Sequence, residues 1–182
     1  MTFEIILGII LAGILSNNYA LLHFLGTGAV LENERSNRRS VVLGLGTTVV
    51  MLLSTLITWP INRYLLVNAS YLQTLVFVCV VLLVVEVIHL LEHGVVEKFC
   101  HVDFTKFAIN GAVLGLCIHN THLGLIEALV TALGVGIGFT VVLMVFSALE
   151  HRVDEDAVPE AFHGLPIHLL TAGMIALALL CF

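Results

Sequence analysis

The stretch GLGTTVVML at residues 44–52 recurs as GIGFTVVLM at residues 136–144, and this recurrence decides the fold. A shift of 92 residues superposes the two stretches and matches two glycines, one threonine and two valines between them. The same shift, without a gap, places Asn18 on Asn110. Scattered matches among Val, Leu and Gly are common in apolar sequences, but one constant offset across several segments is not. The sequence therefore predicts an internal repeat, with repeat one at residues 1–92 and repeat two at residues 93–182.

Composition places the chain in a membrane. Of its 182 residues, 59% are hydrophobic and only 11% are charged, whereas soluble domains are about 25% charged. Most of its apolar stretches approach the ~20 residues that a helix needs to cross a bilayer. The six stretches are residues 3–25, 41–59, 70–91, 104–119, 125–149 and 165–182. We therefore expect an all-α integral membrane protein with six transmembrane helices.

The orientation of these helices follows from the number of membrane crossings in each repeat and from the distribution of positive charge. Each repeat has an odd number of crossings, so the second repeat enters the membrane from the opposite side and the repeats are inverted. Six of the seven Lys and Arg residues lie in the first, third and fifth connections, and only Arg63 lies on the other face. The positive-inside rule makes those connections cytoplasmic and leaves both termini outside. The first segment carries Glu4 in place of the basic start of a signal peptide, so we expect it to be retained.

Polar residues interrupt the first helix of each repeat. Ser16, Asn17 and Asn18 divide the first apolar segment, and Asn110 with Gly111 interrupts the fourth. The sequence therefore predicts discontinuous first and fourth helices. Irregular backbone at membrane depth requires partners from protein or a water-filled cavity, so these asparagines are candidates for an ion site near the midplane. The alternative interpretation is that they cap helices or join one helix to another.

Other polar side chains favour ordinary structural roles. Glu86, His89 and His93 share one helix face near a helix end, a position that favours interfacial snorkelling over a metal or proton site. Cys117, His119 and His122 are metal-ligand types within six residues, but no fourth ligand is visible, and we expect no metal site there. The net charge is −6 with no basic patch, so no nucleic-acid partner is expected.

Several stretches resemble one known membrane family. They follow one another in order along nearly the whole chain, and the last is the most specific because its V-P-x-x-F-x-G turn leads into I-x-L-L-T-A-G. The stretches are NNYALLHFLG (17–26), GLGTTVVM (44–51), YLQTLVFV (71–78), NGAVLG (110–115), GIGFTVVLMVFSALEHR (136–152) and VPEAFHGLPIHLLTAGMIALA (158–178). The family contains the A subunit of the Rnf electron-transport complex, also called the SoxR-reducing complex, and the D and E subunits of the Na+-translocating NADH:quinone reductase.

The resemblance implies a six-helix, inverted-repeat subunit of the bacterial inner membrane, embedded in lipid, with both termini periplasmic. It also implies a homologous partner subunit of opposite topology, together with other Rnf-type subunits. In the family, this pair shares a 2Fe-2S cluster near the midplane, with one cysteine from the first helix and one from the fourth helix of each partner. The cluster relays electrons in an enzyme that couples redox chemistry to Na+ or H+ movement.

This chain departs from the family at both cysteine positions, which fall on Gly28 and Gly111. Glycine has no donor side chain, so neither position can ligate iron. Cys117 lies six residues beyond Gly111, which displaces it by ~9 Å along a helix, and it is a poor substitute. We therefore expect this chain to bind no cofactor of its own.

Two functional classes remain open from the sequence. In the first, the chain is a non-catalytic or electron-relay subunit of an Rnf-type ion-translocating electron-transport complex. In the second, it is a non-redox carrier or structural membrane protein that moves an ion or a small solute past Asn18 and Asn110.

Overall fold

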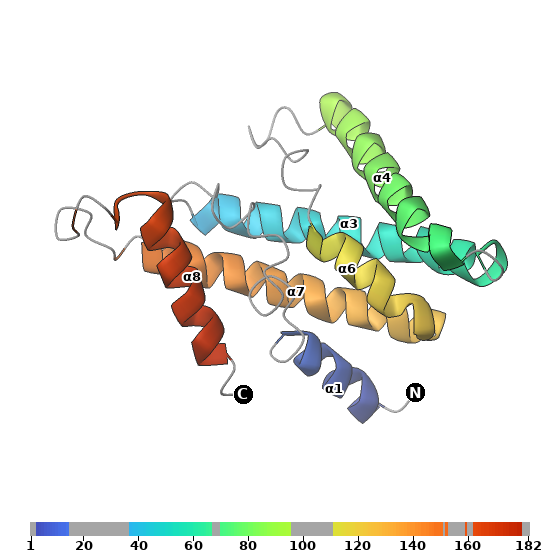
Figure 1. The fold of residues 1–182 in the computed structure, drawn as a ribbon, viewed down its shortest axis with the longest axis horizontal. Coiled ribbons are helices and arrows are strands. Elements are labelled where there is room, and N and C mark those ends of the chain that lie inside the picture. Colours follow the sequence, from blue (N-terminus) through green and yellow to red (C-terminus); the bar gives the residue numbers. More distant parts are fainter. Residues whose placement is uncertain are drawn as a thin grey trace.

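In the computed structural model, every secondary-structure element among the described residues is helical (Figure 1). The described residues are 3–14, 37–66, 70–95, 111–150, 152, 159 and 162–179. The α-helices are α1 (Phe3–Ile14), α3 (Asn37–Tyr64), α4 (Gln73–Val95), α6 (Gly111–His119), α7 (Leu125–Glu150) and α8 (Leu165–Leu179), and the short 3-10 helices are η1 (Ser70–Leu72) and η2 (Asn120–His122). The predicted all-α class is thus confirmed for this part of the chain.

Two of these helices are long and apolar enough to cross a membrane. They are Ser40–Tyr64 within α3 and Leu125–Leu149 within α7, with 25 residues each. At ~1.5 Å per residue each exceeds the ~30 Å thickness of a bilayer core. The remaining apolar helices are shorter, and α6 has only nine residues. Six full crossings therefore stay a prediction, and the expected interruption at Ser16 lies outside the described residues.

The two long helices form an antiparallel central pair (Figure 1). Gly44 of α3 lies against Thr140 of α7, and Thr48 of α3 lies against Gly136 of α7. A Cβ atom added to Gly44 would stand 2.5 Å from Thr140 Oγ1, and one added to Gly136 would stand 2.5 Å from Thr48 Cγ2. Only glycine permits this approach of the two backbones.

The contacts in this pair are reciprocal under the offset seen in the sequence. Adding 92 to Gly44 and Thr48 gives Gly136 and Thr140, so the same Gly–Thr contact occurs twice with the roles of the helices exchanged. Each threonine hydroxyl also donates to the glycine carbonyl four residues earlier in its own helix, at 2.7 Å for Thr48 and 2.9 Å for Thr140. A pseudo-twofold axis perpendicular to the two helices therefore relates them locally.

Burial along the two helices follows the same offset. Buried pairs include Leu43/Val135, Met51/Leu143 and Thr55/Ser147. Exposed pairs include Leu45/Ile137, Val49/Val141, Leu53/Val145 and Ile57/Leu149. The exposed residues recur every four positions and thus form one apolar stripe on each helix. The two helices therefore present equivalent faces to the interior and to the surroundings.

The other helices pack around this pair. Gly13 of α1 lies against Gly134 of α7, where a Cβ atom on Gly13 would stand 2.8 Å from the Gly134 carbonyl carbon. Helices α4 and α6 contact α3 and each other, and α8 contacts α7. The ring of His168 in α8 meets Phe146 of α7 edge to face, with centroids 6.3 Å apart. These contacts place the small residues of the sequence at helix crossings, as glycines are used in membrane proteins.

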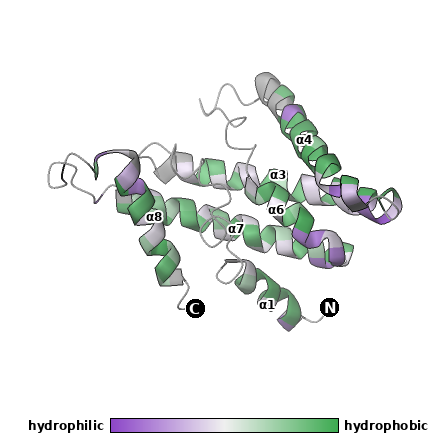
Figure 2. Cartoon of the chain, viewed as in Figure 1, coloured by the Kyte–Doolittle hydropathy of each residue, from purple (hydrophilic) through white to green (hydrophobic). Residues whose placement is uncertain are grey.

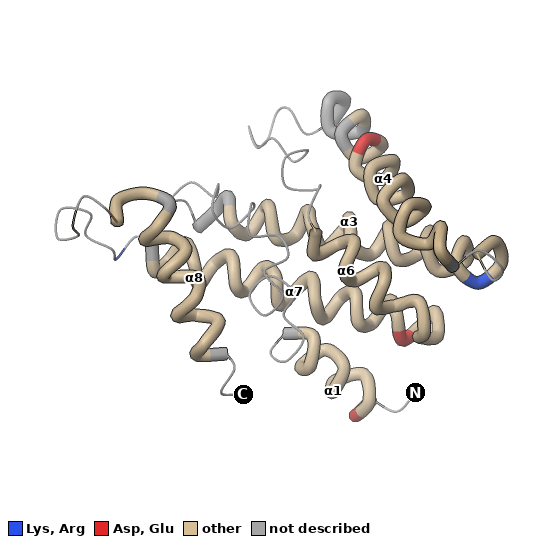
Figure 3. Tube along the Cα trace, viewed as in Figure 1, with Lys and Arg blue, Asp and Glu red and all other residues tan. Residues whose placement is uncertain are grey.

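The outer surface of the described helices is mostly apolar (Figure 2). The few charged residues stand mainly at helix ends (Figure 3), as Glu4 does in α1, Arg63 in α3 and Glu127 in α7. Large exposed hydrophobic side chains on every long helix would be costly in water and favourable in lipid. The surface is that of a membrane protein.

Candidate functional site

Buried polar side chains gather on the second half of α3. Ser54, Thr55 and Thr58 are all buried, and the Thr58 hydroxyl donates to the Ser54 carbonyl at 2.7 Å. Residues three and four positions apart share a helix face, so Thr55 and Thr58 are directed to the same neighbour. That neighbour is the segment formed by α6 and η2, which packs on α3.

Asn120 is the centre of this polar region. It begins η2 directly after α6, and its side chain is only 3% exposed. Its Nδ2 donates to the Ala128 carbonyl of α7 at 3.2 Å and to Thr55 Oγ1 of α3 at 3.5 Å. Its Oδ1 is buried and has no hydrogen-bond partner among the described residues. The amide therefore joins three elements and still has an acceptor to offer.

Cys117 completes the group from the turn of α6 before Asn120. It is buried, and its thiol hydrogen-bonds with the hydroxyl groups of Thr58 and Thr55. We call Thr55, Thr58, Cys117 and Asn120 the α3–α6 polar cluster. Asn62, Thr121 and two aromatic residues lie around it, and these side chains pack too closely to leave space for a water molecule between them.

Two further hydrogen bonds close the cluster on the side of the α6–α7 connection. Trp59 Nε1 donates to the Leu123 carbonyl at 3.0 Å, and Asn62 Nδ2 donates to the Thr121 carbonyl at 3.3 Å. Carbonyl groups in this non-α-helical connection are thereby satisfied by side chains of α3, as buried or membrane-embedded backbone requires. The connection is held in register with α3.

The α3–α6 polar cluster contains no Asp, Glu, Lys, Arg or His. It therefore holds no general base that could activate the Cys117 thiol. Across the described ranges, no group of three or more His, Cys, Asp and Glu side chains is placed to hold a metal ion. Hydroxyl and amide oxygens can instead hold a small cation or pair with another polar group.

Most of the candidate site residues singled out in the sequence lie outside the part of the chain that the structure describes. Asn17, Asn18 and Asn110, the candidates for a midplane ion site, lie outside the described residues, as does Gly28. Gly111 is described as the first residue of α6 and is exposed.

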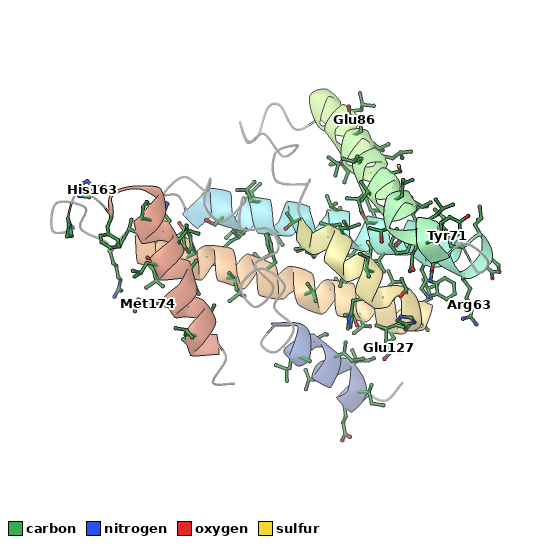
Figure 4. All side chains as sticks on the ribbon, viewed as in Figure 1. Arg63, Tyr71, Glu86, Glu127, His163 and Met174 are labelled. Atoms are coloured by element: carbon green, nitrogen blue, oxygen red, sulfur yellow. The ribbon has the colours of Figure 1, made fainter. Side chains whose placement is uncertain are left out.

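The structure describes only part of the two polar groups for which the sequence favoured structural roles. Glu86 is exposed on α4 (Figure 4), whereas the side chains of His89 and His93 lie outside the description. Cys117 is buried but His119 and His122 are exposed, so these three side chains occupy different environments.

The iron–sulfur cluster implied by the resemblance does not fit the described part of α6. Gly111 offers no side chain, and Cys117 lies nearly two helical turns further along, among the hydroxyl groups of Thr55 and Thr58. Neither neighbouring hydroxyl is a thiolate, the usual ligand of such clusters. The side chains on α6 therefore supply no ligand at the family position.

Apolar outer faces, two helices long and apolar enough to cross a membrane and an uncharged polar cluster between helices are the features of a helical membrane protein. Within that class, the chain belongs to the Rnf-Nqr family: the profile described as "Rnf-Nqr subunit, membrane protein" matches residues 6–182.

Similar proteins carry one recurring name. The chain is 34% identical to the protein of Syntrophotalea carbinolica named as the A subunit of the ion-translocating oxidoreductase complex, over 96% of this chain and 94% of the relative. It is 31% identical to the protein of the same name from Glaesserella parasuis, with the same coverage of both chains. It is also 30% identical to the protein of Acetobacterium woodii named as the A subunit of the Na(+)-translocating ferredoxin:NAD(+) oxidoreductase complex, again over 96% and 94%.

Proposed function

We propose that this chain is a membrane subunit of an Rnf-type ion-translocating electron-transport complex. The observation that carries the proposal is similarity along the whole length: the family profile spans residues 6–182, and the relatives with that function in their names align over 96% of the chain. The apolar helical surface is the one such a subunit needs.

Its architecture in the membrane is six helices arranged as two inverted three-helix repeats, with discontinuous first and fourth helices. The reciprocal contacts of Gly44 with Thr140 and of Gly136 with Thr48 support this arrangement. If the repeats were related by an axis along the membrane normal, α3 and α7 would run parallel. Their antiparallel packing instead suits an axis in the membrane plane.

The partners in this proposal are a homologous membrane subunit of opposite topology, the other Rnf-type subunits and the surrounding lipid. The chain lies in the bacterial inner membrane with both termini periplasmic. It holds no iron–sulfur ligands of its own, because Gly28 and Gly111 occupy the family cysteine positions. Its role is thus structural or ion-conducting.

The test is purification of the affinity-tagged chain from its native membrane. We expect the flavin-binding and iron–sulfur subunits of the complex to co-purify together with the homologous membrane subunit, and deletion of the chain to abolish ion transport driven by electron transfer. Purification of the chain alone, together with unchanged redox-driven transport after deletion, would reject the proposal.

Iron and acid-labile sulfide analysis tests the absence of ligands. We expect no stoichiometric cluster in the anaerobically purified chain. Partner subunits hold clusters too, so in the intact complex the sensitive comparison is between wild type and a variant in which Cys117 is replaced by Ser. The iron content and EPR signals of the two should be equal. Loss of a cluster in the Cys117 variant would show that this chain ligates iron and takes part in electron relay.

The second candidate is a non-redox carrier or structural membrane protein. It is favoured by the missing cysteines at Gly28 and Gly111 together with the uncharged α3–α6 polar cluster. Uptake of an ion or solute by the chain alone in liposomes, without any electron donor, would support it.

A further inference from the structure

We infer that the α3–α6 polar cluster binds a dehydrated monovalent cation of the size of Na+, with Asn120 Oδ1 as its main ligand. This site rests on the proposed function, since it consists of residues of this chain that would hold the transported ion. All of its residues have described positions, and it lies at a different place in the chain from the asparagines singled out in the sequence.

Asn120 Oδ1 is a buried acceptor that lacks a partner. The residue is 3% exposed, and its Oδ1 has no hydrogen-bond partner in the described structure. The opposite end of the amide is already fixed, because Nδ2 donates to the Ala128 carbonyl at 3.2 Å and to Thr55 Oγ1 at 3.5 Å. A buried acceptor without a partner is rare in native proteins and calls for a ligand or an ion.

The chemistry of the neighbouring atoms selects the kind of ion. Thr55, Thr58 and Asn120 line the same small pocket, and the oxygen atoms of their side chains are all uncharged. Hard cations prefer oxygen ligands, but sites for Ca²⁺ and Mg²⁺ use carboxylates. No carboxylate lines this cluster. The thiol of Cys117 is a soft donor and is not a ligand for a hard cation of any charge, so the oxygen atoms alone would hold the ion. Uncharged oxygen atoms solvate a cation through their dipoles and neutralise none of its charge, so a monovalent ion is the least costly cation for such a donor set.

The size of the space selects a dehydrated ion. The lining side chains leave no space for a water molecule. A hydrated ion cannot enter without rearrangement, whereas a dehydrated Na+ is smaller than water and replaces its hydration shell by protein oxygens, as ions in selectivity filters do.

The cluster lies near one end of α3. Thr55 lies nine residues before the end of α3 at Tyr64, which is ~14 Å along the helix. Between the cluster and that end lie Asn62 and the Thr121 carbonyl, joined by a 3.3 Å hydrogen bond. Polar groups therefore lie between the cluster and this end of α3.

The direct test is equilibrium binding of ²²Na+ to the full-length chain reconstituted in lipid nanodiscs. We expect wild type to bind one Na+ per chain, and Thr55→Val, which is close in shape, to weaken binding at least tenfold. Thr131→Val is the matched control, because Thr131 is also buried but donates within its own helix to the Glu127 carbonyl. No binding by wild type, or equal weakening in Thr55→Val and Thr131→Val, would overturn the inference.

Asn120→Asp separates a ligand from a structural residue. The aspartate keeps the oxygen that faces the cation and adds a negative charge, but it loses the amide donor to the Ala128 carbonyl. A cation ligand predicts Na+ binding at least as tight as in wild type, whereas a purely structural role predicts loss of binding along with loss of thermal stability.

A second measurement uses Cys117 as a native reporter in a variant with the other three cysteines replaced by Ala. We expect Na+ to slow alkylation of Cys117 by a small maleimide, choline to have no effect, and Thr55→Val to abolish the protection. Cys79, which is exposed on α4, should react at the same rate with and without Na+ when it is the retained cysteine. Equal rates for Cys117 in Na+ and choline would count against the site.

Failure of the cation site and failure of the proposed function give different experimental results. If the chain binds Na+ at this cluster but does not co-purify with electron-transport subunits, the site stands and the proposed function fails. If the complex assembles but ²²Na+ does not bind the chain, only the site fails.

Discussion

Gly44 and Gly136 set how close the two central helices come. Each lies under a threonine of the opposite helix, and a Cβ atom at either position would stand within 3 Å of three atoms of that threonine. Such distances force a shift of the helix, because threonine is stiff at its branched carbon. Thr48 and Thr140 are further held by bonds to carbonyl groups of their own helices. The crossing therefore tolerates no additional atom on either side.

Alanine at either glycine tests this crossing. We expect Gly44→Ala and Gly136→Ala to destabilise the protein by about 1–3 kcal/mol each, the usual cost of overpacking, and by similar amounts because their surroundings are equivalent. Thermal unfolding in detergent measures the effect. Gly8→Ala and Gly173→Ala are the controls, since a Cβ atom at these helical positions would meet nothing within 4 Å. The controls should be neutral or slightly stabilising, and equal stability of all four variants would contradict the packing.

Gly164 has a different role from the crossing glycines. It is the last residue before α8, with φ of +72°, and the Phe162 amide donates to the Pro159 carbonyl at 2.8 Å just before it. Glycine adopts this left-handed conformation without the cost paid by other residues. Gly164 is the final glycine of the V-P-x-x-F-x-G stretch, which was the most specific part of the resemblance. The left-handed backbone conformation at this position therefore accounts for a glycine there.

At the scale of elements, α3 organises the structure. Its first half packs on α7 through the glycine crossing, and its second half packs on α6 and η2 through the polar cluster. Pro60 lies inside the helix near its end, where the loss of one amide donor affects only the last turns. Beside it, Trp59 and Asn62 reach across to the α6–α7 connection. One helix thus positions both the crossing and the candidate site.

Trp59→Phe tests this attachment. The change keeps an aromatic ring but removes the donor to the Leu123 carbonyl, so we expect a loss of about 0.5–1.5 kcal/mol, the net worth of one hydrogen bond. Amide hydrogen exchange should become faster in residues 120–124 and stay unchanged in α8. Thr171→Val is the matched control, because its hydroxyl donates within α8 to the Ile167 carbonyl. Unchanged exchange in the connection would show that the indole bond does not hold it.

The sequence predicted the helical elements well where apolar length decided them. The segment expected at residues 125–149 is α7 at Leu125–Glu150, whereas the segment expected at 41–59 extends to Asn37–Tyr64 in α3. An apolar run marks the part of a helix within lipid, but backbone hydrogen bonds continue the helix into the polar boundary. Polar residues such as Asn62 and Arg63 therefore belong to α3.

The candidate site was harder to predict. Asn120 directly follows the fourth apolar segment and was not singled out in the sequence, and the asparagines that were singled out there are not among the described residues. Its burial depends on how α6 packs against α3, which no local pattern encodes. The threonines of α3 gave no signal either, because threonine is common in membrane helices and often bonds to its own backbone.

At the scale of the whole molecule, the pseudo-symmetry is strong in the centre and weaker outside it. Val84 of α4 and Ala176 of α8, related by the offset of 92, are both buried. Phe77 and Leu169 are related in the same way, yet Phe77 is 0% exposed and Leu169 is 43% exposed. Phe77 lies beside α6 at the polar cluster, and the residues of repeat one that correspond to α6 fall outside the described ranges. The correspondence at an offset of 92 residues thus holds at the central crossing and is weaker in the outer helices that the structure describes.

The antiparallel central pair fixes which segments share a membrane face. Arg63, Tyr71 and Glu127 stand at one end of the pair, and His163 stands at the other (Figure 4). The end near His163 is where α3 begins and α7 finishes, and it carries Arg38, Arg39 and Arg152 in sequence. In the orientation that we propose from the positive-inside rule, this end is cytoplasmic and the end with Tyr71 is periplasmic.

Single cysteines test the orientation in a background whose four native cysteines are replaced by Ala. Tyr71 and His163 are both exposed, so each replacement by Cys should be open to a water-soluble reagent. We expect Tyr71→Cys to react with a membrane-impermeant maleimide on intact spheroplasts, and His163→Cys to react only after the membrane is permeabilised. The charge asymmetry that sets this orientation rests on few residues. Adding two lysines to the connection that contains Tyr71 should therefore give a mixture of molecules in the two opposite orientations. Labelling of His163→Cys on intact spheroplasts would contradict this orientation. The end of α3 nearest the α3–α6 polar cluster would then face the cytoplasm.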